Sequence, residues 1–181
     1  HFRLPEGAAI VGQLVQFFHL GDNMSSKTTA TKENALSKQE IDDRLGATAL
    51  ARLATYRPDG MIHLTPIWYH WNGEVFRLTL GAGRIHLKNL AADNRISILI
   101  DEDPRLEQGI AAGAWAIMCR GTAELSQDED LIREVTLSVI GMALGQEDAN
   151  TYLEPVMAEG RTIVTMTPQE WTTWDYNKGD A

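Results

Sequence analysis

Two tight-turn signals separate three short apolar runs, and this spacing constrains the fold more than any other feature. Arg57-Pro58-Asp59-Gly60 follows a run at residues 49–56, and Asn72-Gly73 follows a run at residues 62–71. Pro-Asp-Gly and Asn-Gly sequences favour reversals between neighbouring strands. A third run at residues 74–79 completes a second hairpin. The pattern predicts an antiparallel sheet, because parallel strands need a long crossover connection.

The rest of the chain alternates short strands with a few helices. Ser37 and Glu40 have the spacing of a capping box, for a helix that stops near Gly46. Ser126 is expected to cap a helix over residues 127–144. Another helix is expected at residues 84–92, and strands at residues 95–101, 115–125 and 161–166. About six strands joined mainly by short turns favour a barrel over a doubly wound sheet. The expected class is mainly β with flanking helices (α+β).

Charge and cysteine content exclude several classes of protein. The 181 residues carry a formal net charge of -9 and one cysteine, Cys119. The negative charge argues against general binding of nucleic acids or anionic membranes, because both need a basic surface. A single cysteine allows no intrachain disulfide and argues against a cysteine metal site. We therefore expect a reducing, cytoplasmic setting.

Residues 1–35 are expected to form an N-terminal extension, and residues 36–178 the main domain. The apolar residues between Ala8 and Leu20 form a helical stripe. Glycine and polar residues interrupt this run, which argues against a segment that spans a bilayer. The stripe is either an amphipathic helix that packs on the body or on a partner subunit, or a remnant that precedes Met24.

A basic cluster stands out in this acidic chain just after Thr79. Arg84, His86 and Lys88 surround the predicted start of a helix that follows the glycine-rich turn at residues 81–83. Backbone N–H groups at a helix start and cationic side chains both favour a bound phosphate. Arg84 and Lys88 are four residues apart and share a helix face, so a solvated basic surface is the alternative.

The preceding strand carries a proline. Pro66 cannot donate to a sheet ladder, so the run at residues 64–69 is predicted to lie at an edge or a bulge. Free backbone groups beside Trp68 suit a flat heteroaromatic ligand. An ordinary edge strand with a core tryptophan is the alternative.

No arrangement of residues indicates hydrolysis or a metal site. The sequence has no nucleophile elbow, no Walker A loop and no complete Gly-x-Gly-x-x-Gly motif. His63 and His70 flank one strand without a carboxylate pair at ligand spacing. We therefore predict no catalytic acid–base residue and no metal ligand.

Several short motifs occur in an order that is similar to one known family. They are Leu53-Ala54-Thr55, Pro58-Asp59-Gly60, residues 63–69, Thr79, residues 84–90, residues 93–97, residues 120–124 and Thr173-Trp174-Asp175. Over residues 36–177 the chain resembles the pyridoxamine 5'-phosphate oxidase-like split-barrel superfamily. It most resembles the small actinobacterial branch, whose members use FMN or the deazaflavin coenzyme F-420.

The resemblance implies a six-stranded antiparallel split β-barrel and a homodimer with cofactor sites at the interface. The cofactor-binding residues that it implies are Thr65, Pro66, Ile67 and Trp68 along the isoalloxazine ring; Thr79, Arg84, His86, Lys88 and Asn89 around the ribityl chain and phosphate; and the aromatic residues Trp115 and Trp174 from the partner subunit.

Two departures from the family pattern affect the phosphate site. His86 stands where the family usually has lysine, and Arg84 where it has serine. Histidine binds phosphate best when protonated, so we expect cofactor affinity to weaken as the pH rises past about 6.5. The substrate-binding tail of the larger enzyme is not visible, which argues against oxidation of pyridoxamine phosphate.

The expected activity is an oxidoreductase that transfers hydride between FMN, or alternatively coenzyme F-420, and a small organic substrate. The cofactor would carry the chemistry and the protein would supply binding and orientation. One alternative is a non-catalytic cofactor carrier. Another is a haem-binding relative with His63, His70 or His86 as axial ligand.

Overall fold

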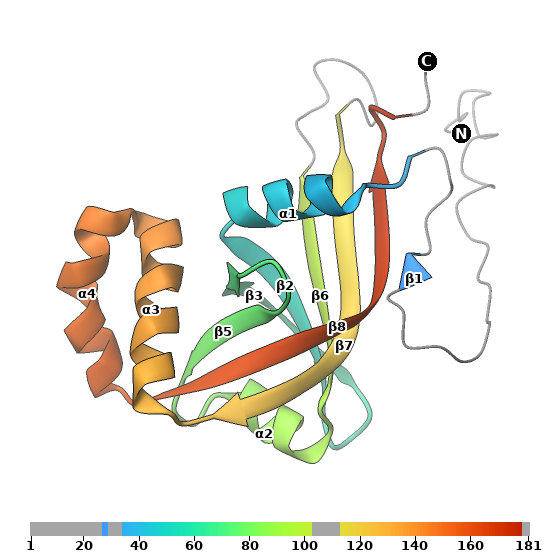
Figure 1. The fold of residues 1–181 in the computed structure, drawn as a ribbon. Helices are drawn as coiled ribbons and strands as arrows, with labels where there is room; N and C mark the ends of the chain where they lie inside the picture. Colours follow the sequence, from blue (N-terminus) through green and yellow to red (C-terminus); the bar gives the residue numbers. More distant parts are fainter. Residues whose placement is uncertain (1–26, 29–33, 103–112, 179–181) are drawn as a thin grey trace, which may run out of the picture.

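A computed structural model describes residues 27–28, 34–102 and 113–178 of the chain. These residues form one curled sheet, a half-barrel, with four flanking helices (Figure 1). The strands are β1 (Lys27–Thr28), β2 (Leu50–Tyr56), β3 (Ile62–Trp68), β4 (His70–Trp71), β5 (Phe76–Gly81), β6 (Arg95–Glu102), β7 (Trp115–Ser126) and β8 (Arg161–Asp175). The helices are α1 (Lys38–Ala47), α2 (Ile85–Ala92), α3 (Glu129–Leu144) and α4 (Gln146–Ala158). The predicted split-barrel class is confirmed.

The strand order places β3 at one edge of the sheet. The order is β3-β2-β6-β7-β8-β5-β4, all pairs being antiparallel, and β1 adds a short parallel pair with β8. The edge position that Pro66 predicted is therefore confirmed. The expected single strand at residues 62–71 is wrong, because β3 pairs with β2 whereas β4 pairs with β5. Between them Tyr69 is fully buried and donates its hydroxyl to the Leu45 carbonyl oxygen at 3.1 Å, which anchors the crossing between the two edges.

Alternate strand residues form the core inside the curl. On β2 the buried positions are Ala51, Leu53 and Thr55, and their neighbours are half-buried or exposed. The same period of two runs through the other long strands, as a strand with one face in the core requires. Helix α1 covers one end of the half-barrel and adds Ile41 and Leu45 to the core (Figure 1).

Helix caps follow the sequence in one case and differ in another. Ser37 and Glu40 form the predicted capping box at the start of α1. The prediction that Ser126 caps α3 is wrong, since Asp128 accepts the Leu131 N–H at 2.8 Å and Ser126 ends β7. Helix α4 was not predicted. Gly145, with φ of 97°, separates it from α3, and the two helices stand as a hairpin beside the sheet (Figure 1).

Strand β8 extends well past the predicted end at Met166. It pairs with β7 along its length, with a register shift at Arg120/Gly121. At that shift the two backbones approach so closely that a Cβ on Gly121 would lie 2.0 Å from the Thr167 carbonyl oxygen. Only glycine fits there, so the bulge and the long curved strand depend on this residue.

Candidate functional site

A polar cluster lies where the edge strand β3 meets helix α2. His63 and Thr65 occupy alternate positions of β3, opposite the core residues Thr55 and Leu53 of β2, so they point towards the inner face. The Thr65 hydroxyl oxygen lies 2.7 Å from Nε2 of His86 on α2. The rings of His63 and His86 contact edge to face, with centroids 4.9 Å apart. The structure thus brings together two of the sequence-predicted site residues, Thr65 and His86, and adds His63.

Several buried polar atoms of this cluster have no hydrogen-bond partner among the described residues. They are Nδ1 of His86, Nε2 of His63 and Oδ1 of Asn89. His86 is 7% exposed and Asn89 is fully buried, with its Nδ2 donating to the Thr55 hydroxyl at 3.0 Å. An unpaired buried polar atom costs about 1–3 kcal/mol, so such atoms are concentrated where a ligand or ordered water binds.

The surroundings of His86 disfavour its charged form in the free protein. Burial lowers the pKa of His86 below its ordinary value, and the nearby His63 and Arg84 lower it further. An anion beside the ring would have the opposite effect, because it stabilises the imidazolium form. His86 is therefore a group whose charge depends on what is bound next to it.

Helix α2 separates the predicted basic residues onto two faces. Arg84 is its N-cap residue, is exposed, and has no ion pair with a carboxylate of the described residues. Lys88 is also exposed, one turn later, whereas His86 and Asn89 point inwards. The first N–H groups of a helix lack intrahelical acceptors and carry partial positive charge. Arg84 and these N–H groups are therefore donors for an anion at the start of α2, and Arg84 lies near enough to His86 to lower its pKa.

Several of the other residues that were predicted to bind the cofactor do not join this polar cluster. The Thr79 hydroxyl is 2.9 Å from the Thr136 hydroxyl of α3, so it helps to hold that helix. Ile67 is half-buried on the inner side of β3, whereas Pro66 and Trp68 are exposed on its outer side. The family resemblance implied that these neighbours lie along one ligand, but the strand's period of two divides them between opposite faces of the sheet.

Trp115 and Trp174 contact residues of β6, β7 and α1. The Trp115 indole N–H donates to Glu102 at 3.1 Å, and the Arg44 guanidinium lies 4.7 Å from its ring centroid. Trp174 is half-buried on β8 opposite Ala116. Their expected role as residues donated by a partner subunit remains a prediction.

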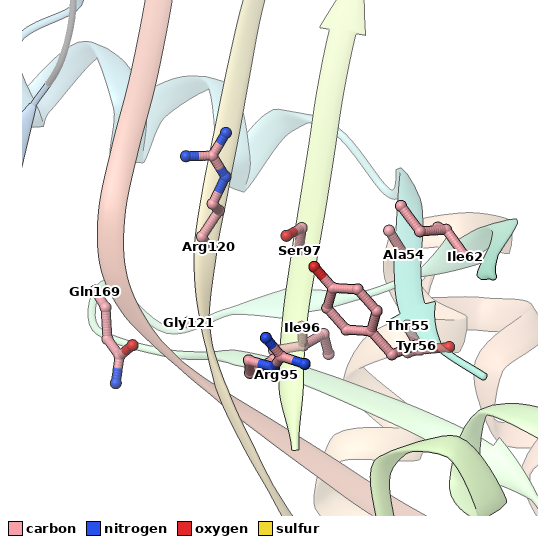
Figure 2. Close-up of a pocket in the computed structure, with 10 residues that line it drawn as sticks. All are labelled: Ala54, Thr55, Tyr56, Ile62, Arg95, Ile96, Ser97, Arg120, Gly121 and Gln169. Carbon is pink, nitrogen blue, oxygen red and sulfur yellow. The ribbon is translucent and has the colours of Figure 1, made fainter. Parts of the chain in front are cut away.

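A cavity of about 210 Å³ on the outer face of the sheet was not predicted. Figure 2 shows the Tyr56 ring reaching from β2 towards Ser97 and Arg95 of β6, with Arg120 on β7 beyond. Arg95 stacks on Tyr56 at 4.4 Å and pairs with Asp93, and Arg120 pairs with Glu170 at 2.8 Å. Because each guanidinium already has a carboxylate, this cavity has little charge to offer an anion. The outward positions of Arg95 and Arg120 in predicted strands were the signal that could have revealed it.

The described residues contain neither a cluster of metal ligands nor a helix suited to span a membrane. No group of three or more His, Cys, Asp or Glu side chains there could hold a metal ion. None of the helices formed by residues 34–102 and 113–178 combines the length and apolar character needed to cross a membrane.

The antiparallel half-barrel with flanking helices is the fold of the split-barrel class. The chain belongs to the pyridoxamine 5'-phosphate oxidase family, whose model matches residues 37–175. The family resemblance that the motif order indicated is therefore confirmed.

Solved structures of similar fold come from several sources. The conserved hypothetical protein Rv2991 from Mycobacterium tuberculosis is 25% identical, with a TM-score of 0.70 over 82% of this chain and 90% of that protein. An F420 reductase is 22% identical, with a TM-score of 0.55 over 72% of this chain and 94% of its own. HutZ, the haem storage protein from Vibrio cholerae, is 17% identical, with a TM-score of 0.55 over 72% of this chain and 88% of its own. The last two likenesses show the fold alone.

Proposed function

We propose that this protein binds a flavin-type cofactor, FMN or coenzyme F-420, and works as an oxidoreductase on a small organic substrate. The observation that carries the proposal is His86 near the start of α2, which is 7% exposed and whose Nδ1 has no hydrogen-bond partner among the described residues. Imidazolium, guanidinium and helix N–H groups are the donors that a phosphate needs. Family membership supports the same assignment.

The residues present fit the phosphate of such a cofactor. Arg84 and His86 would bind its oxygens, and Thr65 would hold the His86 ring in place through Nε2. When bound, the flavin or deazaflavin supplies two-electron hydride chemistry. The chain's own part is binding, orientation and exclusion of water, with Ile67 along the ring on the same side of β3 as Thr65, and Lys88 and Asn89 near the ribityl and phosphate end. Residues 36–178 would form this functional unit.

We further propose that the protein is a homodimer. Ile62, Leu64 and Trp68 are 60%, 63% and 42% exposed on the outer side of β3, with Met61 and Leu50 next to them. An apolar edge strand of this kind is a surface that proteins usually cover. A second copy packed there would bring Trp115 and Trp174 of the partner towards the cofactor. The single buried cysteine, Cys119, fits a reducing compartment such as the cytoplasm.

Titration of the purified protein with FMN, coenzyme F-420 and haemin, followed by visible absorbance, tests the proposal. We expect binding of FMN or F-420, and weaker binding in the Arg84→Ala and His86→Ala variants. Haemin is the comparison because one neighbour of this fold is a haem storage protein and because His63 and His86 adjoin. A sharp Soret band with no flavin or deazaflavin binding would replace this proposal with haem binding. Turnover of enone and quinone substrates by the reduced cofactor separates an enzyme from a carrier.

A further inference from the structure

Two guanidinium groups meet beside the glycine that ends β5. A Cβ placed on Gly81 would lie 3.6 Å from Nη1 of Arg161 and 3.8 Å from Nε of Arg84. Gly81 is the strand partner of Arg161, and its carbonyl oxygen accepts the Arg84 N–H at 3.4 Å. The fold therefore brings two like charges to one turn, an arrangement that a bound anion stabilises.

Neighbouring groups orient Arg161 without neutralising the pair. Nη2 of Arg161 forms an ion pair with Glu159 at 2.9 Å, and Nε donates to the Val156 carbonyl oxygen at 3.0 Å. These contacts hold the Arg161 side chain, which is 13% exposed, so that its Nη1 points towards the turn at Gly81. Glu159 itself is 66% exposed, and Arg84 has no carboxylate partner among the described residues. Among the described residues, the two guanidinium groups therefore have one carboxylate partner between them, Glu159, which pairs with Arg161.

A cavity of about 580 Å³ adjoins this turn and lies between the start of α3, the end of α4 and the start of β8. Ala82 and Arg161 line it on the side of the turn. The remaining lining combines the apolar side chains of Ile132 and Met157 with Gly160 and with the polar or charged side chains of Gln127, Glu129, Asp130, Arg133 and Thr162. Apolar side chains suit the face of a base, and carboxylates accept hydrogen bonds from ribose hydroxyls and amino groups. The same carboxylates would repel a chain of negative charges.

We propose that Arg84 and Arg161 bind the second phosphate of a flavin dinucleotide, whose nucleoside end lies in this cavity. The inference rests on the proposed function, since the first phosphate is the one assigned to His86 and Arg84. It goes beyond it by selecting a pyrophosphate-bearing dinucleotide as the ligand class. FMN would occupy only the first part of the site.

Parallel titrations with FMN, FAD and coenzyme F-420, followed by flavin or deazaflavin fluorescence, test this assignment. The wild-type protein is expected to bind FAD at least about ten-fold more tightly than FMN, because charge-assisted hydrogen bonds are the strong ones. In Arg161→Gln this ratio should fall close to one, with FMN affinity unchanged. Arg57→Gln is the matched control, since Arg57 also pairs with a carboxylate, Asp59, but lies on the β2–β3 turn. It should keep the wild-type ratio.

A second variant does not depend on the packing of Arg161. Gly81→Ala puts a methyl group between the two guanidinium groups at ordinary contact distances, so the fold should be kept. It should also remove the preference for FAD. The proposal is overturned if wild-type protein binds FAD no more tightly than FMN, if both variants keep the preference, or if F-420 shows the Arg161-dependent gain in place of FAD. Binding of neither flavin nor deazaflavin would instead overturn the proposed function itself.

Discussion

Nε2 of His86 lies 2.7 Å from the hydroxyl oxygen of Thr65, and this contact joins helix α2 to the edge strand β3. The two residues are 21 positions apart in the chain. The hydrogen bond fixes one ring nitrogen of a buried histidine, and Nδ1 has no partner within the described part of the chain. Thr65 thus sets the orientation of the group that we assign to the cofactor phosphate.

Replacing Thr65 with valine should lower the free energy of unfolding by about 1–3 kcal/mol, because His86 Nε2 would then be buried without a partner. Urea denaturation followed by circular dichroism measures this change. Thr165→Val is the control, since Thr165 is half-buried on β8 and forms no side-chain hydrogen bond with the described residues. Equal loss of stability in the two variants would contradict the structural role of the Thr65–His86 contact.

Affinity for FMN should increase as the pH falls. Burial, with His63 and Arg84, holds the pKa of His86 below its ordinary value in the free protein. A bound phosphate raises that pKa, so binding takes up a proton. The dissociation constant should therefore decrease as the pH falls from above the pKa of His86 in the complex to its lower pKa in the free protein. Fluorescence titration between about pH 8 and pH 5 covers this window around the reference value. His86→Gln should keep only the slope due to the phosphate's own ionisation, and an unchanged slope would contradict the assignment.

Stability of the cofactor-free protein should depend on pH with the opposite sign. A histidine with a lowered pKa in the folded state is protonated first in the unfolded chain. The contribution of His86 to the free energy of unfolding is therefore complete above its pKa in the unfolded chain, about 6.5. This contribution decreases as the pH falls from there towards the lower pKa of the folded state. Thermal unfolding of wild type and His86→Gln over this range measures the difference. A wild-type curve that falls no more steeply than that of the variant would rule out this linkage.

Introducing a charge on the outer side of β3 should separate the proposed dimer. Leu64 is 63% exposed in one chain, so Leu64→Arg leaves the fold of the single chain unchanged while it charges the apolar surface. Light scattering after size exclusion should report the mass of one chain instead of two. Leu144→Arg is the matched control, because Leu144 is 44% exposed at the end of α3. The dimer surface would be misplaced if Leu64→Arg kept the wild-type mass.

Alanine at Gly121 should prevent stable folding. The added Cβ would lie 2.0 Å from a backbone oxygen of β8, which can move only if the β7–β8 pairing changes. Gly46→Ala is the control, since nothing lies within 4 Å of that Cβ position in α1. Alanine in a helix is favoured over glycine by about 0.5–1 kcal/mol, so the control should be at least as stable as wild type. Comparable thermal stability of both variants would contradict the close approach.

Features that depend on neighbouring residues in sequence were predictable. The Ser37–Glu40 capping box, the turns at residues 57–60 and 72–73, and the edge position of β3 all depend on local backbone chemistry, and the structure contains them. Helix α4 was missed because its sequence contains Pro155, a residue that ordinarily breaks a helix interior. The break at Tyr69 was missed because only tertiary packing distinguishes one long strand from two strands at opposite edges.

The candidate site shows the same division. Sequence alone determined the family, a basic segment at the start of α2, and the histidine at the position where lysine is usual. Only the tertiary structure decided that His63 joins His86, that Thr79 bonds to Thr136, and that Arg161 lies beside Arg84. The physical reason is that propensity and period act over a few residues, whereas these contacts join strands and helices that are distant in sequence. Their geometry is determined by how the sheet curls and by which strands pair.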